Sequence, residues 1–429
     1  MRVHLNYGRE GLGVELPDGL DVTVINKKPM PLLADPAGAM AAALENPAGA
    51  APLGEAAKAA RSACILICDI TRPAPNGLIL PPLVRMLLNA GLAPDDITIL
   101  NATGLHRPNE GAEMEELLGD AWVLETVGAE NHFARDDAAH VEIGKTRRGT
   151  VVKLDRRFVE ADLRIATGLV EPHFMAGWSG GRKVIAPGIA HRETITTFHS
   201  ARYMEDPRCA SCVLDGNPLH EDQLEIVAML GGALAVNTVI DEERRPAFLN
   251  YGEIVASHQA AIDFAAAYTV VPVAEKFSTV VTSAAGYPLD KTYYQTVKGM
   301  VGPMDILKPG GNIIIASECS EGMGSAEYVA AQRRLLELGP ENFLATIKGQ
   351  QYAEIDEWQT EMQLKPQRQG QIQLFTEGLA GEDRWLTGVE MINSVEDAVA
   401  ASVAATGDKR IAVVPEGPYV VPAYSPDGT

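Results

Sequence analysis

The sequence is short of cysteine, of long apolar runs and of positive charge. Its five cysteines are an odd number in 429 residues, a usage typical of reduced thiols in the cytoplasm. No apolar run reaches the roughly 18 residues of a membrane span, and the N-terminal stretch lacks the apolar core of a signal peptide. With 36 basic and 57 acidic residues the formal charge is −21, which disfavours nucleic acid as a partner.

The pattern of apolar residues predicts an α/β fold. Short β-branched runs alternate with longer stretches rich in Ala and Leu, as in βαβ units with a mostly parallel sheet. The pattern restarts near residue 270, in the segment Thr269–Ala274. We therefore predict two domains, 1–270 and 271–429, each a mostly parallel sheet flanked by helices, with the active site in the cleft between them.

Individual elements follow from the same pattern. Predicted strands span 64–68, 96–100, 163–166, 233–240, 278–282, 312–316, 371–375 and 411–414. Predicted helices span 78–90, 192–198 and 251–267, and a further helix leads through Lys298.

Reactive side chains follow three of the predicted strands in the first domain. The strand ending at Cys68 is followed by Asp69 and Arg72, the next by His106 and Arg107, and the third by His173 and Lys183. Ligands of open α/β sheets bind at the carboxyl ends of the strands, so these side chains are expected at one edge. Unrelated polar loop residues are the alternative.

His106 and His173 lie between turns rich in Gly and Pro, not on an amphipathic face. Imidazole titrates near neutral pH, so two histidines at adjacent strand ends predict a pair of acid/base groups. The segment 177–181, Gly-Trp-Ser-Gly-Gly, is either a tight turn or a phosphate cradle. Neither a P-loop nor a G-x-G-x-x-G fingerprint is present, so ordinary NAD binding is unsupported.

Other candidates have two readings each. Tyr294 and Lys298 are four residues apart and share a helix face with Gln295 beside them, which suits either a substrate cleft or a solvated surface. His199, considered alone, is as readily structural as a metal ligand. Cys209 and Cys212 have C-x-x-C spacing without a second pair, so we predict structural thiols.

Taken together, these segments resemble the nickel-pincer lactate racemase family over almost the whole chain. The resemblance rests on Asp69–Pro75, Thr103–Pro108, the long motif Glu171–Gly188, Thr197–Ser200, Gly216–His220 and Gly286–Gly299. The long motif, Glu-Pro-His-Phe-Met-Ala-Gly-Trp-Ser-Gly-Gly-Arg-Lys-Val-Ile-Ala-Pro-Gly, is the most specific of them.

The resemblance implies a cofactor that composition does not reveal, a nickel-pincer nucleotide with a thioamide and a thiocarboxylate on a pyridinium mononucleotide. By this resemblance Lys183 forms the covalent thioamide link, and His199 coordinates the nickel, a metal that imidazole suits. His106 and His173 match the two acid/base residues. The remaining matched positions are Asp69, Thr71, Ser179, Gly180 and Gly181 around the cofactor, and Arg72, Tyr294, Gln295, Lys298 and Trp358 around the substrate.

The implied activity is racemisation or epimerisation of a lactate-like 2-hydroxy acid by reversible hydride transfer through a 2-keto acid. Trp178 and Met175 depart from the aromatic residues common beside His173 in the family, so lactate, malate, aromatic hydroxy acids and sugar acids all stay open. The expected partners are the small substrate and the enzymes that synthesise the cofactor; the oligomeric state is open. The alternative function is a non-catalytic sensor that binds a carboxylate or mononucleotide.

Overall fold

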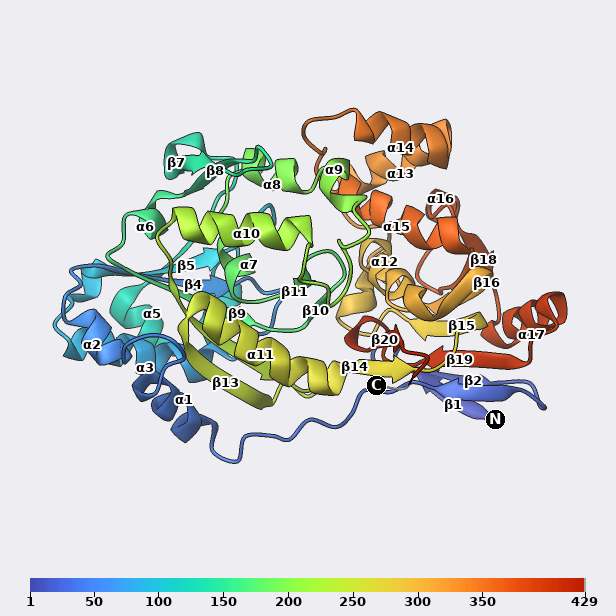
Figure 1. Cartoon of the computed structure of the whole chain (residues 1–429), viewed down its shortest axis with the longest axis horizontal. Helices are drawn as coiled ribbons and strands as arrows, with labels where there is room; N and C mark the ends of the chain where they lie inside the picture. The colour runs from blue at the N-terminus through green and yellow to red at the C-terminus, as the bar shows by residue number, and fades with distance from the viewer. Residues whose placement is uncertain (428–429) are drawn as a thin grey trace. The chain divides into compact units, whose positions relative to one another are not determined.

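The computed structural model describes residues 1–427 and divides into two compact units made of non-contiguous segments. Unit 1 comprises 1–28, 199–212 and the chain from Tyr268 onward, and unit 2 comprises 29–198 and 213–267. The predicted domains, 1–270 and 271–429, differ from these two units. The prediction assigns 1–28 and 199–212 to the first domain, whereas both segments belong to unit 1 with the C-terminal part of the chain. Strand β3 (Asp21–Val24) pairs in parallel with β19 (Arg410–Val414), so the blue N-terminal strands lie among the elements of unit 1 (Figure 1).

Unit 2 is built on a six-stranded sheet in the order β13-β12-β9-β4-β5-β6. Only the β12–β13 pair is antiparallel. The sheet strands are β4 (Ala63–Cys68), β5 (Ile97–Ala102), β6 (Ala129–Asn131), β9 (Leu163–Leu169), β12 (Leu234–Ile240) and β13 (Pro246–Glu253). Two hairpins accompany them, β7 (His140–Lys145) with β8 (Val151–Asp155), and β10 (Pro172–His173) with β11 (Gly177–Trp178).

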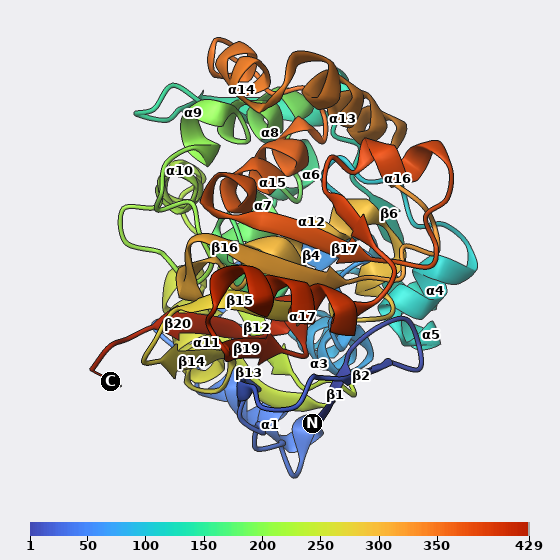
Figure 2. The same ribbon diagram turned by 90° about the vertical axis from the view of Figure 1, so that its right-hand side faces the viewer.

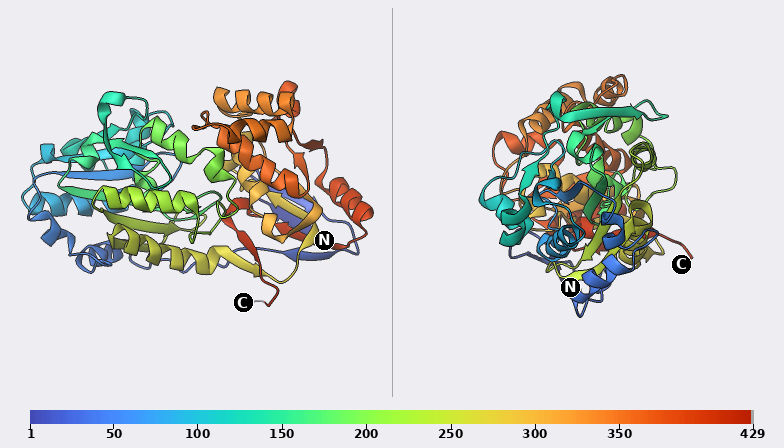
Figure 3. Two further views of the ribbon diagram at one scale, coloured as in Figure 1. Left: turned by 45° about the horizontal axis from the view of Figure 1, so that its top comes forward. Right: turned by 90° about the vertical axis from the view of Figure 1, so that its left-hand side faces the viewer.

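Helices flank this sheet because its central strand is apolar along its whole length. Every residue of β4 is buried, which is typical of a parallel strand covered on both faces. Apolar side chains of α1 to α5 form a core with the strands, and α7 contacts β4 and β9. In Figure 1 the green and yellow-green helices α10 and α11 lie in front of the strands, as they do in the left view of Figure 3. The helices are α1 (Pro36–Glu45), α2 (Leu53–Ala57), α3 (Asn76–Asn89), α4 (Ala112–Leu118), α5 (Ala121–Val127), α6 (Arg156–Val159), α7 (Arg182–Ile185), α8 (Arg192–Phe198), α10 (Pro218–Met229) and α11 (Ile254–Thr269).

Unit 1 contains an all-parallel six-stranded sheet in the order β18-β17-β16-β15-β19-β3. Helix α17 (Val395–Thr406) packs on β15 and β16 and crosses in front of the sheet in Figure 2. The other strands are β1 (Arg2–Leu5), β2 (Leu12–Glu15), β14 (Val270–Val273), β15 (Phe277–Ser283), β16 (Leu307–Ala316), β17 (Gln371–Phe375), β18 (Glu390–Ile392) and β20 (Val421–Tyr424). The other helices are α9 (Ala201–Met204), α12 (Tyr293–Val301), α13 (Ala326–Leu338), α14 (Pro340–Lys348), α15 (Glu357–Gln369) and α16 (Glu382–Leu386).

The α/β fold with mostly parallel sheets is confirmed, and each predicted strand overlaps an observed one. The start of the predicted helix 251–267 is wrong. Residues 251–253 belong to β13, which alternates between half-buried and buried side chains and pairs antiparallel with β12. The predicted boundary segment contains β14, which pairs with β20. Within residues 1–427, no helix combines the length and apolarity needed to cross a membrane.

Candidate active site

Three neighbouring strands of unit 2 carry the candidate residues at their carboxyl ends. Strand β4 lies between β9 and β5 and is parallel to both, so the segments that follow the three strands lie at one edge of the sheet. Asp69 directly follows β4, His106 lies in the loop after β5, and His173 lies in β10 just after β9. The strands are therefore neighbours, as predicted from the sequence.

Asp69 joins the first of these loops to the second. Asp69 is 6% exposed, and its Oδ2 lies 2.5 Å from Nδ1 of His106. The Thr71 hydroxyl donates to the other oxygen at 2.6 Å. Burial raises the pKa of Asp69, but the bonds from His106 and Thr71, with the charge of Arg72, outweigh burial and lower it. Asp69 is therefore an anion that orients His106 with Nδ1–H toward the carboxylate, which leaves proton exchange to Nε2.

His173 has different surroundings. Its Nδ1 accepts hydrogen bonds from the backbone amides of Met175 at 3.3 Å and Ala176 at 3.1 Å. Two N–H donors directed at one ring nitrogen oppose its protonation, so neutral His173 carries its hydrogen on Nε2. The two histidines thus lie at adjacent strand ends but differ in the group that faces Nδ1.

Two cations lie near the same edge of the sheet. Arg72 forms an ion pair with Glu171 at 2.5 Å, with both side chains partly exposed. Lys183 is half-buried on α7, where its amide donates to the carbonyl of Gly180 at 3.0 Å. Burial raises the pKa of the Cys68 thiol at the end of β4, and the charges of Arg72 and Lys183 partly offset that rise. Both cations therefore lie close enough to the end of β4 for their charges to lower the pKa of the Cys68 thiol. Glu171 opens the longest family motif, but sequence reasoning gave it no role.

The glycine-rich loop is shaped by close packing inside unit 2. A Cβ on Gly180 would lie 2.6 Å from the Val170 side chain, and one on Gly181 would lie 2.6 Å from the ring of His258. Both glycines have positive φ, at +74° and +46°. The Ser179 hydroxyl donates to the Leu169 carbonyl at 2.7 Å. These contacts account for a tight turn; a cofactor-binding role for Ser179, Gly180 and Gly181 stays a prediction.

The second group of candidates lies in unit 1. His199, between α8 and α9, is 8% exposed, and its ring lies 4.7 Å from that of Trp358 on α15. Burial raises the pKa of Tyr294 far above its ordinary value, Asp356 raises it further, and a hydrogen bond from Trp358 lowers it. Trp358 therefore contacts both the predicted metal ligand and a predicted substrate residue.

Two more polar residues belong to this group on α12. Gln295 has a buried Oε1 that accepts no hydrogen bond from any residue in 1–427. Lys298 lies one turn further along the helix and is half-buried. A buried acceptor without a donor is costly, so Gln295 is suited to a ligand that supplies a hydroxyl or N–H group.

An unpaired carboxyl group lies one turn along α15 from Trp358. Glu361 is 1% exposed, and its Oε1 has no hydrogen-bond partner in the part of the chain that the structure describes. Burial, with the charge of Glu205, raises the pKa of Glu361 to about 8, so the group is protonated at neutral pH. Sequence reasoning missed it, since a Glu in a helix carries no signal of burial.

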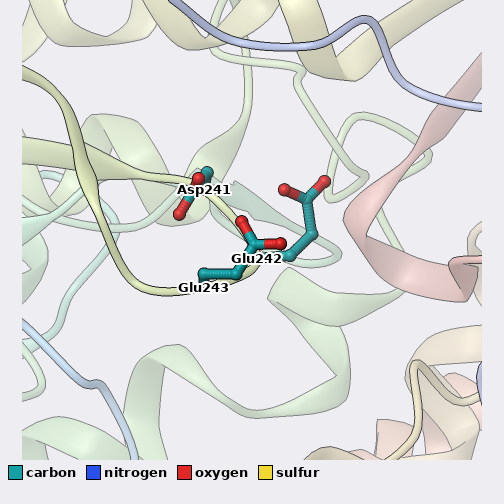
Figure 4. Close-up of side chains that lie close together, drawn as sticks. All are labelled: Asp241, Glu242 and Glu243. Carbon is teal, nitrogen blue, oxygen red and sulfur yellow. The ribbon is translucent and has the colours of Figure 1, made fainter. Parts of the chain in front are cut away.

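Residues 1–427 contain one group of three potential metal-ligating residues whose ligand atoms lie close together, formed by Asp241, Glu242 and Glu243 (Figure 4). Arg245 pairs with both Asp241 and Glu243 at 2.6 Å, which balances one of the three negative charges. Within the described residues His199 belongs to no such group, and its role as a metal ligand stays a prediction. The five cysteines are free thiols in this structure.

The predicted site residues thus fall into two groups, one on each unit. Unit 2 brings together Asp69, Thr71, Arg72, His106, His173, Ser179, Gly180, Gly181 and Lys183 at one sheet edge or in the loops that follow it. Unit 1 carries His199, Tyr294, Gln295, Lys298 and Trp358. That the two groups form one interdomain site stays a prediction.

Comparison with known proteins gives consistent matches along the chain. Residues 7–211 match the family model described as the lactate racemase N-terminal domain, and residues 273–421 match the lactate racemase C-terminal domain. A lactate racemase from Thermoanaerobacterium thermosaccharolyticum is 29% identical over 426 residues, 98% of each chain. One from Lactiplantibacillus plantarum is 34% identical over 286 residues, 66% of each chain.

Solved structures agree with these matches. The lactate racemase apoprotein from Thermoanaerobacterium thermosaccharolyticum has a TM-score of 0.89 at 27% identity, covering 98% of this chain and 99% of that one. A protein from Thermotoga maritima has a TM-score of 0.62 at 18% identity, covering 86% of this chain and 97% of that one. The second likeness concerns the fold alone.

Proposed function

Since the chain belongs to the lactate racemase family and is therefore an isomerase, we propose that it racemises or epimerises a lactate-like 2-hydroxy acid by reversible hydride transfer. The observation that carries the proposal is the pair His106 and His173 at adjacent strand ends, each with Nδ1 fixed by a separate partner. With Nδ1 fixed, Nε2 of neutral His106 can accept a proton from a reacting hydroxyl group, whereas Nε2–H of neutral His173 donates a hydrogen bond until the ring changes tautomer.

The residues present fit a nickel-pincer nucleotide. Lys183 offers a primary amine for a thioamide link, near enough to the end of β4 that its charge acts on Cys68, and His199 offers one imidazole. A lone imidazole suits a metal whose other donors come from a bound organic group. When bound, that group supplies a carbon atom that accepts and returns hydride.

Proton transfer is assigned to the two histidines. His106 takes the substrate hydroxyl proton at Nε2, and Asp69 stabilises the imidazolium that results. For His173 to take a proton at Nε2, its hydrogen must move to Nδ1, which breaks the two amide bonds. Loss of the hydroxyl proton with hydride from Cα leaves a 2-keto acid, and return of hydride to the opposite face inverts the centre.

The carboxylate and hydroxyl groups of the substrate need partners that do not react. Arg72 and Lys298 hold the carboxylate, and for Arg72 the substrate competes with Glu171. Gln295 and Tyr294 supply hydrogen-bonding groups. Met175 and Trp178, the departures from the family pattern, are buried at 3% and 2% exposed.

The proposal places the protein in the cytoplasm, with the enzymes that build the cofactor as partners. The free thiols support this placement. Protein produced beside those enzymes should contain near-stoichiometric nickel.

The chemistry is tested with a 2-hydroxy acid deuterated at Cα, racemised in ordinary water without added NAD. Hydride held in a closed site returns to the same carbon skeleton, so the opposite enantiomer should keep its deuterium at early conversion. Lactate, malate, an aromatic hydroxy acid and a sugar acid are compared by mass spectrometry of the separated enantiomers. Rapid loss of deuterium to water would mean proton abstraction from carbon. Nickel-loaded protein that racemises none of these acids would favour the sensor function.

The attachment site is tested by intact mass. Wild-type protein produced with the cofactor-synthesis enzymes should carry an adduct, and Lys183→Ala should carry none while keeping its fold. Lys153→Ala is the matched control, since Lys153 pairs with Glu193 away from the glycine-rich loop. An adduct that persists on Lys183→Ala contradicts the assignment.

A further inference from the structure

A buried cation lies next to Lys183 in the glycine-rich loop. The side chain of Arg182 is 1% exposed. Its guanidinium donates to the carbonyls of Ala176 at 2.8 Å and Trp178 at 3.3 Å. No ion pair joins Arg182 to a carboxylate in residues 1–427, and burial alone lowers its pKa, to about 9. At neutral pH the group is therefore charged without a counter-ion.

The groups that face this cation carry no negative charge. The ring nitrogens of His258 both lie 3.3 Å from Arg182, and the His258 Nε2–H donates to the carbonyl of Ser179 at 2.7 Å. Burial, then Arg182, lowers the pKa of His258, and the same two causes lower that of His220 to about 3. Both imidazoles are neutral, so backbone carbonyls provide the main compensation for the charge.

An unpaired buried charge is expensive, so its retention calls for a reason. The carbonyls that Arg182 holds belong to the turn after His173. Ala176 is held through its carbonyl by Arg182, while its amide donates to Nδ1 of His173. Arginine can make both contacts because its planar guanidinium presents several donors in a fixed fork. Arg182 is thus linked to His173 through a single residue.

We propose that Arg182 is a positioning residue for His173: its two bonds to the Ala176 and Trp178 carbonyls hold the turn in the shape that aims two amides at Nδ1. The consequence is one fixed tautomer of His173, with the hydrogen on Nε2. The proposal rests on the proposed function only where it treats His173 as an acid/base group.

The test uses the full chain labelled with ¹⁵N-histidine, without cofactor, so its outcome is separate from racemase activity. The His173 signals are identified by their absence from His173→Gln. In wild type, His173 should show an unprotonated Nδ1 and a protonated Nε2. In Arg182→Met the two nitrogens should move toward averaged positions, and the pKa of His173 should rise, because amides that swing away no longer oppose protonation of Nδ1.

Two further variants make the result decisive. Arg182→Lys keeps the charge but cannot form the same fork, so it should show the same change, smaller than in Arg182→Met. Arg164→Met is the matched control: Arg164 also donates to backbone carbonyls, of Ala161 and Leu230, but from the beginning of β9, and it should leave His173 unchanged. An unchanged His173 spectrum in either folded Arg182 variant overturns the proposal, as does a protonated Nδ1 in wild type. If neither Arg182 variant folds, Arg182 serves stability and the proposal is withdrawn.

Discussion

The loops around His106 and His173 place similar rings at neighbouring strand ends in opposite electrostatic surroundings. Nδ1 of His106 faces the carboxylate of Asp69, which favours the protonated ring. Nδ1 of His173 faces two backbone amides, which favour the neutral ring. The difference teaches that two histidines proposed as an acid/base pair need not be equivalent. The first ring has a carboxylate that stabilises its protonated form, and the second has two amide donors that favour one tautomer of its neutral form.

The strongest test of the comparison removes each ring in turn. Loss of a general base costs ~10²–10⁴-fold in rate, and both His106→Ala and His173→Ala should fall in this range. We expect the larger loss for His106→Ala, because only His106 receives a proton without breaking bonds already made. Steady-state racemisation of the loaded enzyme from each enantiomer measures both. Equal losses of rate would show that the different surroundings of the two histidines have no kinetic consequence. Near wild-type rates in either variant would contradict the two-base mechanism.

A smaller effect is expected when only the partner of His106 changes. Asp69→Asn keeps the shape but removes the anion, and a hydrogen bond to a charged group contributes about 1.5–3 kcal/mol. The rate should fall ~10- to 100-fold, since about 1.4 kcal/mol corresponds to a factor of ten. In a plot of rate against pH, the limb set by ionisation of His106 should also move to lower pH, because the imidazolium has lost its counter-ion. Thr71→Val, which removes only a neutral donor to Asp69, is the milder control.

The same contrast between partnered and unpartnered groups extends to carboxyls. Asp69 and Glu361 are both buried, but donors lower the pKa of Asp69 while burial without a partner raises that of Glu361 to about 8. The unfolded chain releases the Glu361 proton near its ordinary value of 4.5, so the free energy of unfolding should fall between there and about pH 8. The slope from this group is at most about 1.4 kcal/mol per pH unit. Urea unfolding of Glu361→Gln should lack this component; an identical pH dependence would contradict it.

The smallest effect concerns the stability that the Asp69–His106 pair contributes. His106 is 61% exposed, so a double-mutant cycle with Asp69→Asn and His106→Gln should give ~0.2–1 kcal/mol near pH 6. The folded pKa of Asp69 is lowered, so this coupling is present above its ordinary value of 3.8 and is lost as pH falls through the folded value. Denaturant unfolding at successively lower pH measures the cycle. A coupling that persists in strong acid would mean that the pair is not ionic.

Much of the unit 2 sheet edge could be predicted because its information is local. An apolar run followed by Asp69, or by the turn around His106, identifies a strand and its carboxyl end within a few residues. Strand β13 was missed for a related reason: its alternating pattern continues directly into α11, and only pairing with β12 separates the two.

The partners of the site residues could not be predicted. Glu171 and Arg72 are 99 residues apart in the chain. The absence of a hydrogen-bond donor to Gln295 Oε1 in the described residues results from how the chain packs around it. Burial without a partner is a property of the fold, so neither the neutral Glu361 nor the charged Arg182 carries a signal in the sequence.

The sequence by itself determined the class of fold, the family motifs and the residue types capable of acid/base chemistry, because periodicity and residue type are local properties of the chain. Only the tertiary structure decided that β3 completes the sheet of unit 1, and that His106 and His173 have opposite partners at Nδ1. The physical reason is that tautomer and charge depend on which donors and acceptors lie within about 3 Å, and those neighbours come from segments far apart in the chain.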